Sequence, residues 1–301
     1  VLPTLTFLRT THPSCLCVLG LRDILDANHL VRYNWTQEGV YGALEQLYHL
    51  ILVYGTQEFF DIVTEYGLSP AVAKRVRFCG YLDRLKTAFS QSATTHTDLR
   101  RELAPYTDRL VVLTAGGGGD GFPLMQAYLL GLGRLEKPTF TSVLVTGPLM
   151  EANELRILCE LAATLPAGTV RIESFLPNPL LLFAAADLVV SMAGYNTVCE
   201  LLALGQRTLL VPRFTPRKEQ LVRATLLAER GLVHMLHPEH LTPERLIDLV
   251  LHSLLQPRPR AEQLVEAGIV FHGQTIATQA ILEGLSTLHD QALRQLAQVV
   301  V

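Results

Sequence analysis

Short apolar runs alternate with amphipathic stretches over the second two thirds of the chain. The runs have the length of strands and are mostly rich in Val, Ile and Leu; they are residues 110–115, 142–146, 170–174, 188–192, 208–211 and 232–236. Helices are expected between them at residues 122–132, 151–164, 196–204 and 220–230. Apolar runs of this kind are typical of parallel strands covered by helices on both faces. The pattern predicts an α/β fold with a doubly wound, Rossmann-like sheet.

The beginning of the chain shows a shorter version of the same pattern. Its expected elements are strands at residues 15–19, 50–54 and 75–79 and a helix at residues 56–66. This is about half of a Rossmann-like domain, so the first domain is expected to be incomplete. We predict a partial first domain at residues 1–90 and a second domain at residues 106–301, joined by a polar, exposed and mobile linker at residues 87–97.

Two helical segments are expected after residue 243, at residues 244–255 and 261–289, with a break near Gly273. The last helix is a candidate for crossing back to the first domain.

The first motif that suggests chemistry is TAGGGGDG, which stands between an expected strand and an expected helix. Consecutive glycines let backbone N–H groups approach a phosphate, and a helix start adds partial positive charge. We interpret Gly117, Gly118, Gly119 and Asp120 as a candidate phosphate cradle. The alternative is a tight turn between strand and helix, which does not require four glycines in a row.

The same letters also satisfy GxGxxG, the pattern of dinucleotide-binding enzymes. That pattern is expected to be followed by an acidic residue at the end of the next strand, where it holds a ribose. Here the next strand ends in Thr146-Gly147-Pro148, and Glu136 lies before the strand. An NAD-dependent oxidoreductase is therefore only a third hypothesis.

A second expected helix start follows the strand at residues 188–192. Gly194 supplies the turn, Asn196 or Thr197 can cap the helix, and Glu200 follows in its first turn, where it can accept hydrogen bonds from a ribose. A capping box between Thr197 and Glu200 explains the same spacing equally well. The candidate binding residues here are Ser191, Gly194, Tyr195, Asn196, Thr197 and Glu200.

A third loop, after the strand at residues 208–211, carries polar side chains next to a helix start. Glu219 and Gln220 can hydrogen-bond sugar hydroxyls, and Arg213 can help to neutralise a phosphate. Taken singly, each of these residues is better explained by a solvated loop with a charged first helical turn.

Composition narrows the functional class. The formal net charge of -3, without a Lys/Arg-rich cluster, argues against a nucleic-acid partner. Five cysteines without CxxC spacing are typical of a reducing cytoplasm. No apolar run approaches the ~20 residues that span a bilayer. A mean hydropathy of +0.27 is high, however, and is compatible with peripheral contact with a membrane or with another subunit.

The stretch from residue 173 to residue 236 resembles the carboxy-terminal domain of the glycosyltransferase family 28 group. The resemblance rests on the loop that begins Glu173-Ser174-Phe175, on the spacing of Gly194, Thr197 and Glu200, and on Glu219-Gln220. It extends over residues 106–236, and more loosely over the first part of the chain. It implies a GT-B-type fold with two Rossmann-like domains, in which the second binds a nucleotide-sugar donor.

The resemblance also implies roles for individual residues. Phe175 and Leu176 would meet the base, Glu200 the ribose, residues 194–197 with 117–119 the diphosphate, and Glu219 with Gln220 the sugar. It favours a UDP-sugar as donor substrate and implies neither a separate cofactor nor a metal, in an inverting reaction on an unidentified acceptor. The chain departs from the family at residues 117–120, and the glycine-rich loop and histidine base of the family's first domain are absent, so no catalytic residue is identified.

A rival hypothesis from another class is a non-catalytic, nucleotide-sugar-binding or scaffold half of a split transferase. This hypothesis predicts the same donor-binding residues as the enzyme hypothesis. The two differ only in whether the chain itself binds the acceptor.

Overall fold

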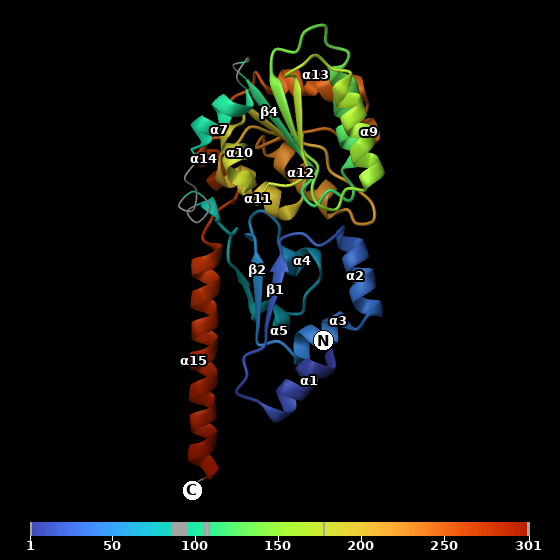
Figure 1. Ribbon diagram of the computed structural model, residues 1–301. Helices are drawn as coiled ribbons and strands as arrows, with labels where there is room; N and C mark the ends of the chain where they lie inside the picture. The colour runs from blue at the N-terminus through green and yellow to red at the C-terminus, as the bar shows by residue number, and fades with distance from the viewer. Residues whose placement is uncertain are drawn as a thin grey trace. The chain divides into compact units, whose positions relative to one another are not determined.

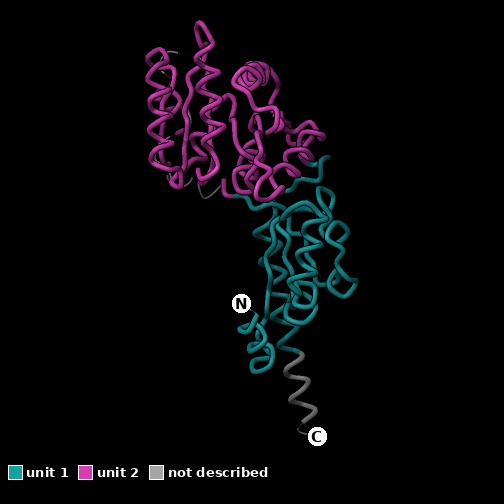
Figure 2. Tube along the Cα trace, turned by 90° about the vertical axis from the view of Figure 1, so that its right-hand side faces the viewer, with its two compact units in different colours: residues 1–83, 265–301 teal, residues 84–264 magenta. Residues whose placement is uncertain are grey.

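The computed structural model describes residues 2–85, 89, 95–104, 107, 109–176 and 178–299, with only the backbone at residues 96 and 291–299. The chain divides into two compact units, coloured separately in Figure 2. Unit 1 comprises residues 1–83 and 265–301, and unit 2 comprises residues 84–264.

Unit 2 alternates strands and helices along the chain (Figure 1). Its elements are α7 (His96–Leu103), β4 (Leu110–Thr114), α8 (Phe122–Leu132), β5 (Thr141–Val145), α9 (Ala152–Ala163), β6 (Val170–Glu173), α10 (Pro179–Ala185), β7 (Leu188–Ser191), α11 (Tyr195–Ala203), β8 (Thr208–Leu210), α12 (Glu219–Glu229), β9 (His234–Met235), the 3₁₀ turn η1 (Pro238–His240), α13 (Pro243–Ser253) and α14 (Ala261–Glu266), the last of which crosses into unit 1.

The six strands of unit 2 that the structure describes form one parallel sheet in the order β6-β5-β4-β7-β8-β9. The chain starts in the middle at β4, builds outward to β6, and then returns to place β7 on the other side of β4. Val112 of β4 is in register with Val143 of β5 and with Val189 of β7. The order reverses between β4 and β7, which makes this pair the switch point of the sheet.

The sheet of unit 2 is covered on both faces, as the unbroken apolar runs predict. Because successive residues of a strand point to opposite faces, Val111 and Leu113 pack with α8, α9 and α13, whereas Leu110 and Val112 pack with α7, α10 and α11. In Figure 1, α9 and α13 accordingly lie on one side of β4, and α7 and α10 on the other. Two apolar layers thus hold the strand ends of unit 2 rigidly in place.

Unit 1 contains a smaller parallel sheet, in the order β1-β2-β3 over the residues described. Its elements are α1 (Leu2–Thr11), β1 (Val18–Arg22), α2 (Asn28–Gln37), α3 (Val40–Gln46), β2 (Leu50–Tyr54), α4 (Ile62–Glu65), α5 (Pro70–Ala73), β3 (Val76–Phe78) and α15 (Gly273–Val299). One face packs on α2 to α5 around the buried Ile51 and Val53.

Helix α15 covers the other face of this small sheet. Ala277 and Ala280 of α15 form a buried cluster with Leu50 and Leu52 of β2, and Figure 1 shows the helix running beside the sheet. The assignment of residues 106–301 to one domain is therefore corrected at its carboxy-terminal end. Without α15, the apolar face of β2 would be exposed to water, and this is the physical reason for the crossing back.

Local structure differs from expectation at three further places. Residues 2–11 form helix α1, in a stretch for which the sequence pattern predicted no element. The helix expected at residues 56–66 is reduced to α4, because Asp61 is its N-cap, with the Asp61 side chain accepting a hydrogen bond of 2.9 Å from the N–H of Val63. Of the expected linker, residues 87, 88 and 90–94 lie outside the described residues, and Thr95 caps α7.

Replacing Ala277 by Glu should lower the free energy of unfolding by at least about 2 kcal/mol, because the change buries an unpaired carboxylate against β2. The matched control is Thr278→Glu on the exposed side of the same helix turn, which should stay within about 0.5 kcal/mol of the unchanged protein. Urea unfolding measures both. Equal losses in the two variants would show that α15 does not cover the sheet.

Candidate functional site

Two of the loops singled out in the sequence follow β4 and β7, the neighbouring strands at the switch point of the unit 2 sheet. Both strands are parallel and in register, with Thr114 opposite Ser191 at their carboxyl ends. Ligands of open α/β sheets bind in the crevice outside the strand ends at such a point. The glycine-rich loop and the start of α11 are thus brought to the place where the fold favours a ligand.

The glycine-rich loop lies directly on the backbone that follows β5. A Cβ atom added to Gly118 would clash with the carbonyl oxygen of Thr146, and one added to Gly147 would clash with that of Gly116. Gly118 also has a φ of +99° and Gly147 one of +88°, which only glycine adopts without strain. These glycines are therefore required by the packing of the two loops.

Other glycines of the loop are available to a ligand. The N–H groups of Gly118 and Gly121 donate to backbone carbonyls within the loop, whereas the described residues offer no acceptor to those of Gly117 and Gly119. Both of these glycines are exposed. The loop therefore combines a fixed backbone with exposed glycines whose N–H groups none of the described residues accepts, as an anion site requires.

Helix α11 begins one residue earlier than the sequence pattern suggested. Gly194 is its N-cap and no side chain caps it, so the N–H groups of Tyr195, Asn196 and Thr197 belong to the first helical turn, which has partial positive charge. A Cβ atom built on Gly116 would lie 3.8 Å from Oγ1 of Thr197, which places the two loops side by side.

The backbone before α11 is supported by a buried arginine that the sequence analysis did not single out. Nη1 of Arg223, in α12, donates to the carbonyl of Ala193 at 2.9 Å, and its guanidinium lies 5.6 Å from the ring centre of Tyr195. The hydroxyl of Ser191 is also buried and donates to the carbonyl of Met192. Ser191 and Tyr195 therefore shape this loop from within.

Glu200 lies in the second turn of α11, and its carboxylate is paired with Arg84. Its Oε1 accepts from Arg84 Nη1 at 3.0 Å, and only 9% of the residue is exposed. The capping-box alternative is wrong, because the N-cap is Gly194 and Thr197 is already inside the helix. Burial raises the pKa of Glu200 more than the Arg84 guanidinium lowers it.

Arg213 connects the glycine-rich loop to the start of α12. Its Nε lies 3.2 Å from Oδ2 of Asp120, and its Nη2 lies 2.8 Å from Oε1 of Glu219. The backbone N–H of Arg213 donates to Oε1 of Gln220, which is buried. The third loop is thus tied to the first by a chain of charges, and Arg213 already has two carboxylate partners.

The loop after β6 stands apart from this group of contacts. Phe175 is 59% exposed, while Leu176 packs on the core beside α10. Since β6 is the edge strand, with β5 between it and β4, these two residues lie on the flank of the switch point. Among the described residues, no backbone hydrogen bond joins Phe175 or Leu176 to the other loops.

A cavity of about 420 Å³ lies beside the glycine-rich loop in unit 2. Its wall includes Gly119 and Asp120 of that loop, Glu154 of α9, and Arg213 and Phe214 after β8. The volume falls within the ~300–1,000 Å³ typical of small-molecule sites. The loops of the switch point therefore enclose space as well as presenting backbone groups.

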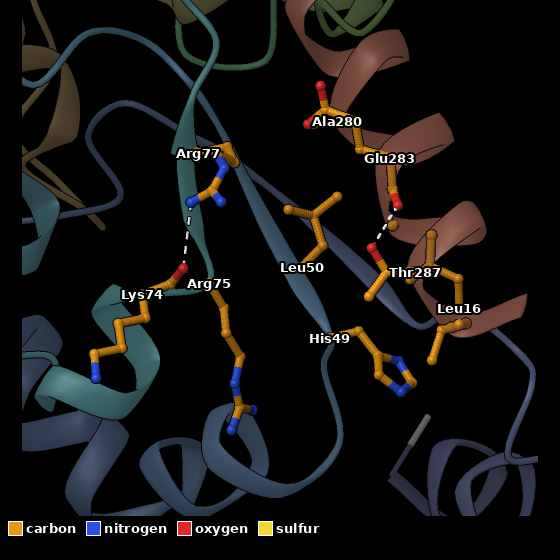
Figure 3. A pocket seen from close by; sticks show the side chains of 11 residues that line it. Leu16, His49, Leu50, Lys74, Arg75, Arg77, Ala280, Glu283 and Thr287 are labelled. Carbon is orange, nitrogen blue, oxygen red and sulfur yellow. Dashed lines mark hydrogen bonds between the residues drawn. The ribbon is translucent and has the colours of Figure 1, made fainter. Parts of the chain in front are cut away.

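A second cavity, of about 350 Å³, lies in unit 1 between β3 and α15 (Figure 3). Lys74, Arg75 and Arg77 line it from one side, and Glu283 from the other. Arg75, however, donates to the carbonyls of Glu45 and Tyr48 at 2.7 and 2.9 Å, which closes the end of α3. Its charge therefore stabilises the fold.

The described residues contain no group of three or more His, Cys, Asp or Glu side chains placed to hold a metal ion. No helix among them is long and apolar enough to cross a membrane.

A doubly wound parallel sheet with glycine-rich and helix-start loops at its switch point is that of the nucleotide-binding class of α/β proteins. Residues 111–275, more than half of the chain, match the glycosyltransferase family 28 C-terminal domain. The chain belongs to this family, which confirms the resemblance drawn from the sequence.

Curated relatives carry the name UDP-N-acetylglucosamine–N-acetylmuramyl-(pentapeptide) pyrophosphoryl-undecaprenol N-acetylglucosamine transferase. One from Lachnoclostridium phytofermentans is 40% identical over 73 residues, 24% of this chain and 21% of the relative. One from Bacillus cereus is 27% identical over 158 residues, 52% of this chain and 43% of the relative. The matched stretches span less than half the length of these relatives.

Solved structures of glycosyltransferases are similar over most of the chain. The kitacinnamycin glycosyltransferase has a TM-score of 0.57 at 20% identity, over 86% of this chain and 61% of that one. VinC, solved in complex with dTDP, has a TM-score of 0.50 at 15% identity, over 88% of this chain and 75% of that one. The expected α/β fold of GT-B type, with parallel sheets, is confirmed.

Replacing Gly118 by Ala should lower the free energy of unfolding by roughly 1–3 kcal/mol, because its positive φ and the adjacent Thr146 carbonyl exclude a Cβ atom. Gly119→Ala is the matched control one residue away, where a Cβ atom would meet open space, and it should stay within about 0.5 kcal/mol. Urea denaturation distinguishes them. A tolerated Gly118→Ala would contradict the close packing of the two loops.

Proposed function

We propose that this chain binds a nucleotide-diphosphate sugar in unit 2 and serves a glycosyltransferase that moves the sugar to an acceptor. The observation that carries the proposal is the pairing of two backbone anion sites, residues 117–119 and the start of α11, at the switch point of a family 28 domain. Glu200 stands beside them, where a ribose attached to the diphosphate would be. A single backbone anion site, without the second one beside it, would be much weaker evidence for a diphosphate ligand.

The geometry supports a division of roles among the candidate residues. The N–H groups of Gly117 and Gly119, with those at the start of α11, hold the diphosphate. Glu200 accepts from the ribose hydroxyls when these replace Arg84. Glu219 and Gln220 support the sugar side of the site through Arg213. Phe175 and Leu176 are assigned to the base of the nucleotide on the family resemblance alone.

We further propose that the reaction is inverting and metal-independent. Helix dipoles and preorganised N–H groups stabilise a leaving diphosphate without a cation. The base of the nucleotide is proposed as uracil, and the transferred group as a hexosyl unit, because the names of the relatives specify UDP-N-acetylglucosamine. Those names also specify a pyrophosphoryl-undecaprenol acceptor. A similar lipid-linked acceptor here would bring the protein into peripheral contact with the cytoplasmic face of a membrane.

Calorimetric titration with UDP, UDP-N-acetylglucosamine, dTDP and NAD tests the donor assignment. UDP and its sugar should bind, dTDP should bind more weakly, and NAD should not bind, since β5 ends in Thr146-Gly147 without the acid that a dinucleotide ribose requires. Binding of NAD in preference to UDP would overturn the proposal. Release of UDP from UDP-N-acetylglucosamine with a polyprenyl-pyrophosphoryl acceptor separates the enzyme from a non-catalytic, donor-binding half.

Replacing Glu200 by Gln should weaken UDP binding at least about tenfold at neutral pH, because charge-assisted hydrogen bonds of about 1.5–3 kcal/mol to the ribose are weakened. The wild-type affinity should increase as the pH rises through the raised pKa of Glu200, since only the carboxylate accepts from both hydroxyls. Arg84→Gln should move that midpoint further upward, because it removes the cation that lowers the pKa.

A 2',3'-dideoxy UDP analogue provides the control for this experiment. The unchanged protein should discriminate strongly between UDP and this analogue, and the Glu200→Gln variant only weakly. Equal discrimination in both proteins would show that Glu200 does not bind the ribose.

A further inference from the structure

Charged residues from distant parts of the sequence meet at the amino edge of the unit 2 sheet. Arg109, Asp187 and Arg207 directly precede β4, β7 and β8, which are parallel neighbours in the sheet. Their shared edge is opposite the carboxyl edge, where the candidate ligand site lies. Arg258, between α13 and α14, reaches the same place, because its Nη2 donates to the carbonyl of Ala186 at 2.8 Å. Arg109, Arg207 and Arg258 form an arginine cluster that no single stretch of the sequence contains.

Backbone carbonyls hold much of this arginine cluster in place. Arg207 donates from Nη1 to the carbonyl of Asp187 at 2.7 Å and from Nε to the carbonyl of Gln256. The Asp187 carboxylate is itself shared, because its Oδ2 accepts from Nη2 of Arg100 at 2.7 Å and from the N–H of Leu110 at 2.8 Å. A carbonyl accepts a hydrogen bond but carries no formal charge. The fold therefore fixes these guanidinium groups without fully neutralising them.

Positive charge is in excess around Arg207. Burial lowers the pKa of Arg207, the charges of Arg258 and Arg109 lower it further, and Asp187 opposes them. Like charges held close together cost free energy. The formal net charge of the whole chain is -3, so the cluster does not follow from a basic composition. An anionic partner at this surface would relieve the repulsion.

The cluster also has donors to spare and an apolar neighbour. Arg109 and Arg258 are exposed; the side chain of Arg109 has no partner among the described residues, and Arg258 uses one of its five N–H donors there. Leu255, which is 71% exposed, lies next to Gln256, whose carbonyl holds Arg207. A small anion would use only the guanidinium groups. A protein surface uses both kinds of contact, and arginine is enriched where proteins bind one another.

We propose that the arginine cluster docks an acidic segment of a partner protein. Carboxylates of that segment accept hydrogen bonds from Arg109 and Arg258, and an apolar side chain of it packs on Leu255. Because the cluster lies at the amino edge of the sheet, the partner leaves the donor site at the carboxyl edge open. A lipid surface at the amino edge would keep a lipid-linked acceptor on the far side of the sheet from the donor site, so a protein partner fits better.

The test measures binding of a fluorescein-labelled peptide of repeated Glu-Asp-Leu units to the unchanged full chain and its variants by fluorescence anisotropy. Arg109→Gln and Arg258→Gln should each weaken binding at least about fivefold, because each removes a charge-assisted pair. Leu255→Ser should weaken it at least about threefold, because apolar contact is lost. Arg156→Gln is the matched control, since it removes the same charge from the exposed face of α9, and it should stay within about twofold. UDP binding should not change in any variant.

Several results would overturn the inference. Equal weakening in Arg109→Gln and Arg156→Gln would show unspecific attraction between charges. Unchanged peptide binding in Leu255→Ser, with displacement of the peptide by inorganic phosphate, would show a small-anion site. Absence of peptide binding, with Arg109-dependent binding to vesicles of phosphatidylcholine and phosphatidylglycerol, would show a membrane contact. Arg109→Gln keeps the test independent of folding, because the Arg109 side chain holds no other described residue in place.

Discussion

The candidate site depends on the direct contact between two backbone segments, the glycine-rich loop after β4 and the turn after β5. Gly118 and Gly147 each lie where any Cβ atom would meet a carbonyl oxygen of the other segment. This contact fixes the loop after β4, in which the N–H groups of Gly117 and Gly119 have no acceptor among the described residues. A run of glycines that looks like flexibility in the sequence is, in the fold, one of its most closely packed parts.

The acidic side chains around this glycine-rich loop are paired with arginines, which allows them to lie near an anion site. Glu200 is paired with Arg84, and Asp120 and Glu219 share Arg213. Each arginine thus partly neutralises carboxylates that would otherwise repel a diphosphate.

The sequence predicted those helices and strands whose ends are marked by nearby residues. Helix α8 begins and ends as expected, because Pro123 and flanking glycines mark its ends. The strands of unit 2 were found because both of their faces are buried, which leaves unbroken apolar runs. The domain boundaries expected from the sequence placed α15 in the second domain, whereas the helix packs on β2 of the first unit. The sequence of an amphipathic helix does not specify which distant surface the helix covers.

Contacts between side chains that are distant in sequence could not be predicted from the sequence. Spacing alone left Glu200 equally explained by a capping box and by a ligand, and only the position of Gly194 as N-cap removed the first explanation. Arg84 and Glu200 are far apart in sequence, and the residues around either one do not predict the ion pair between them. A pairing of this kind belongs to the assembled fold and not to any one segment of it.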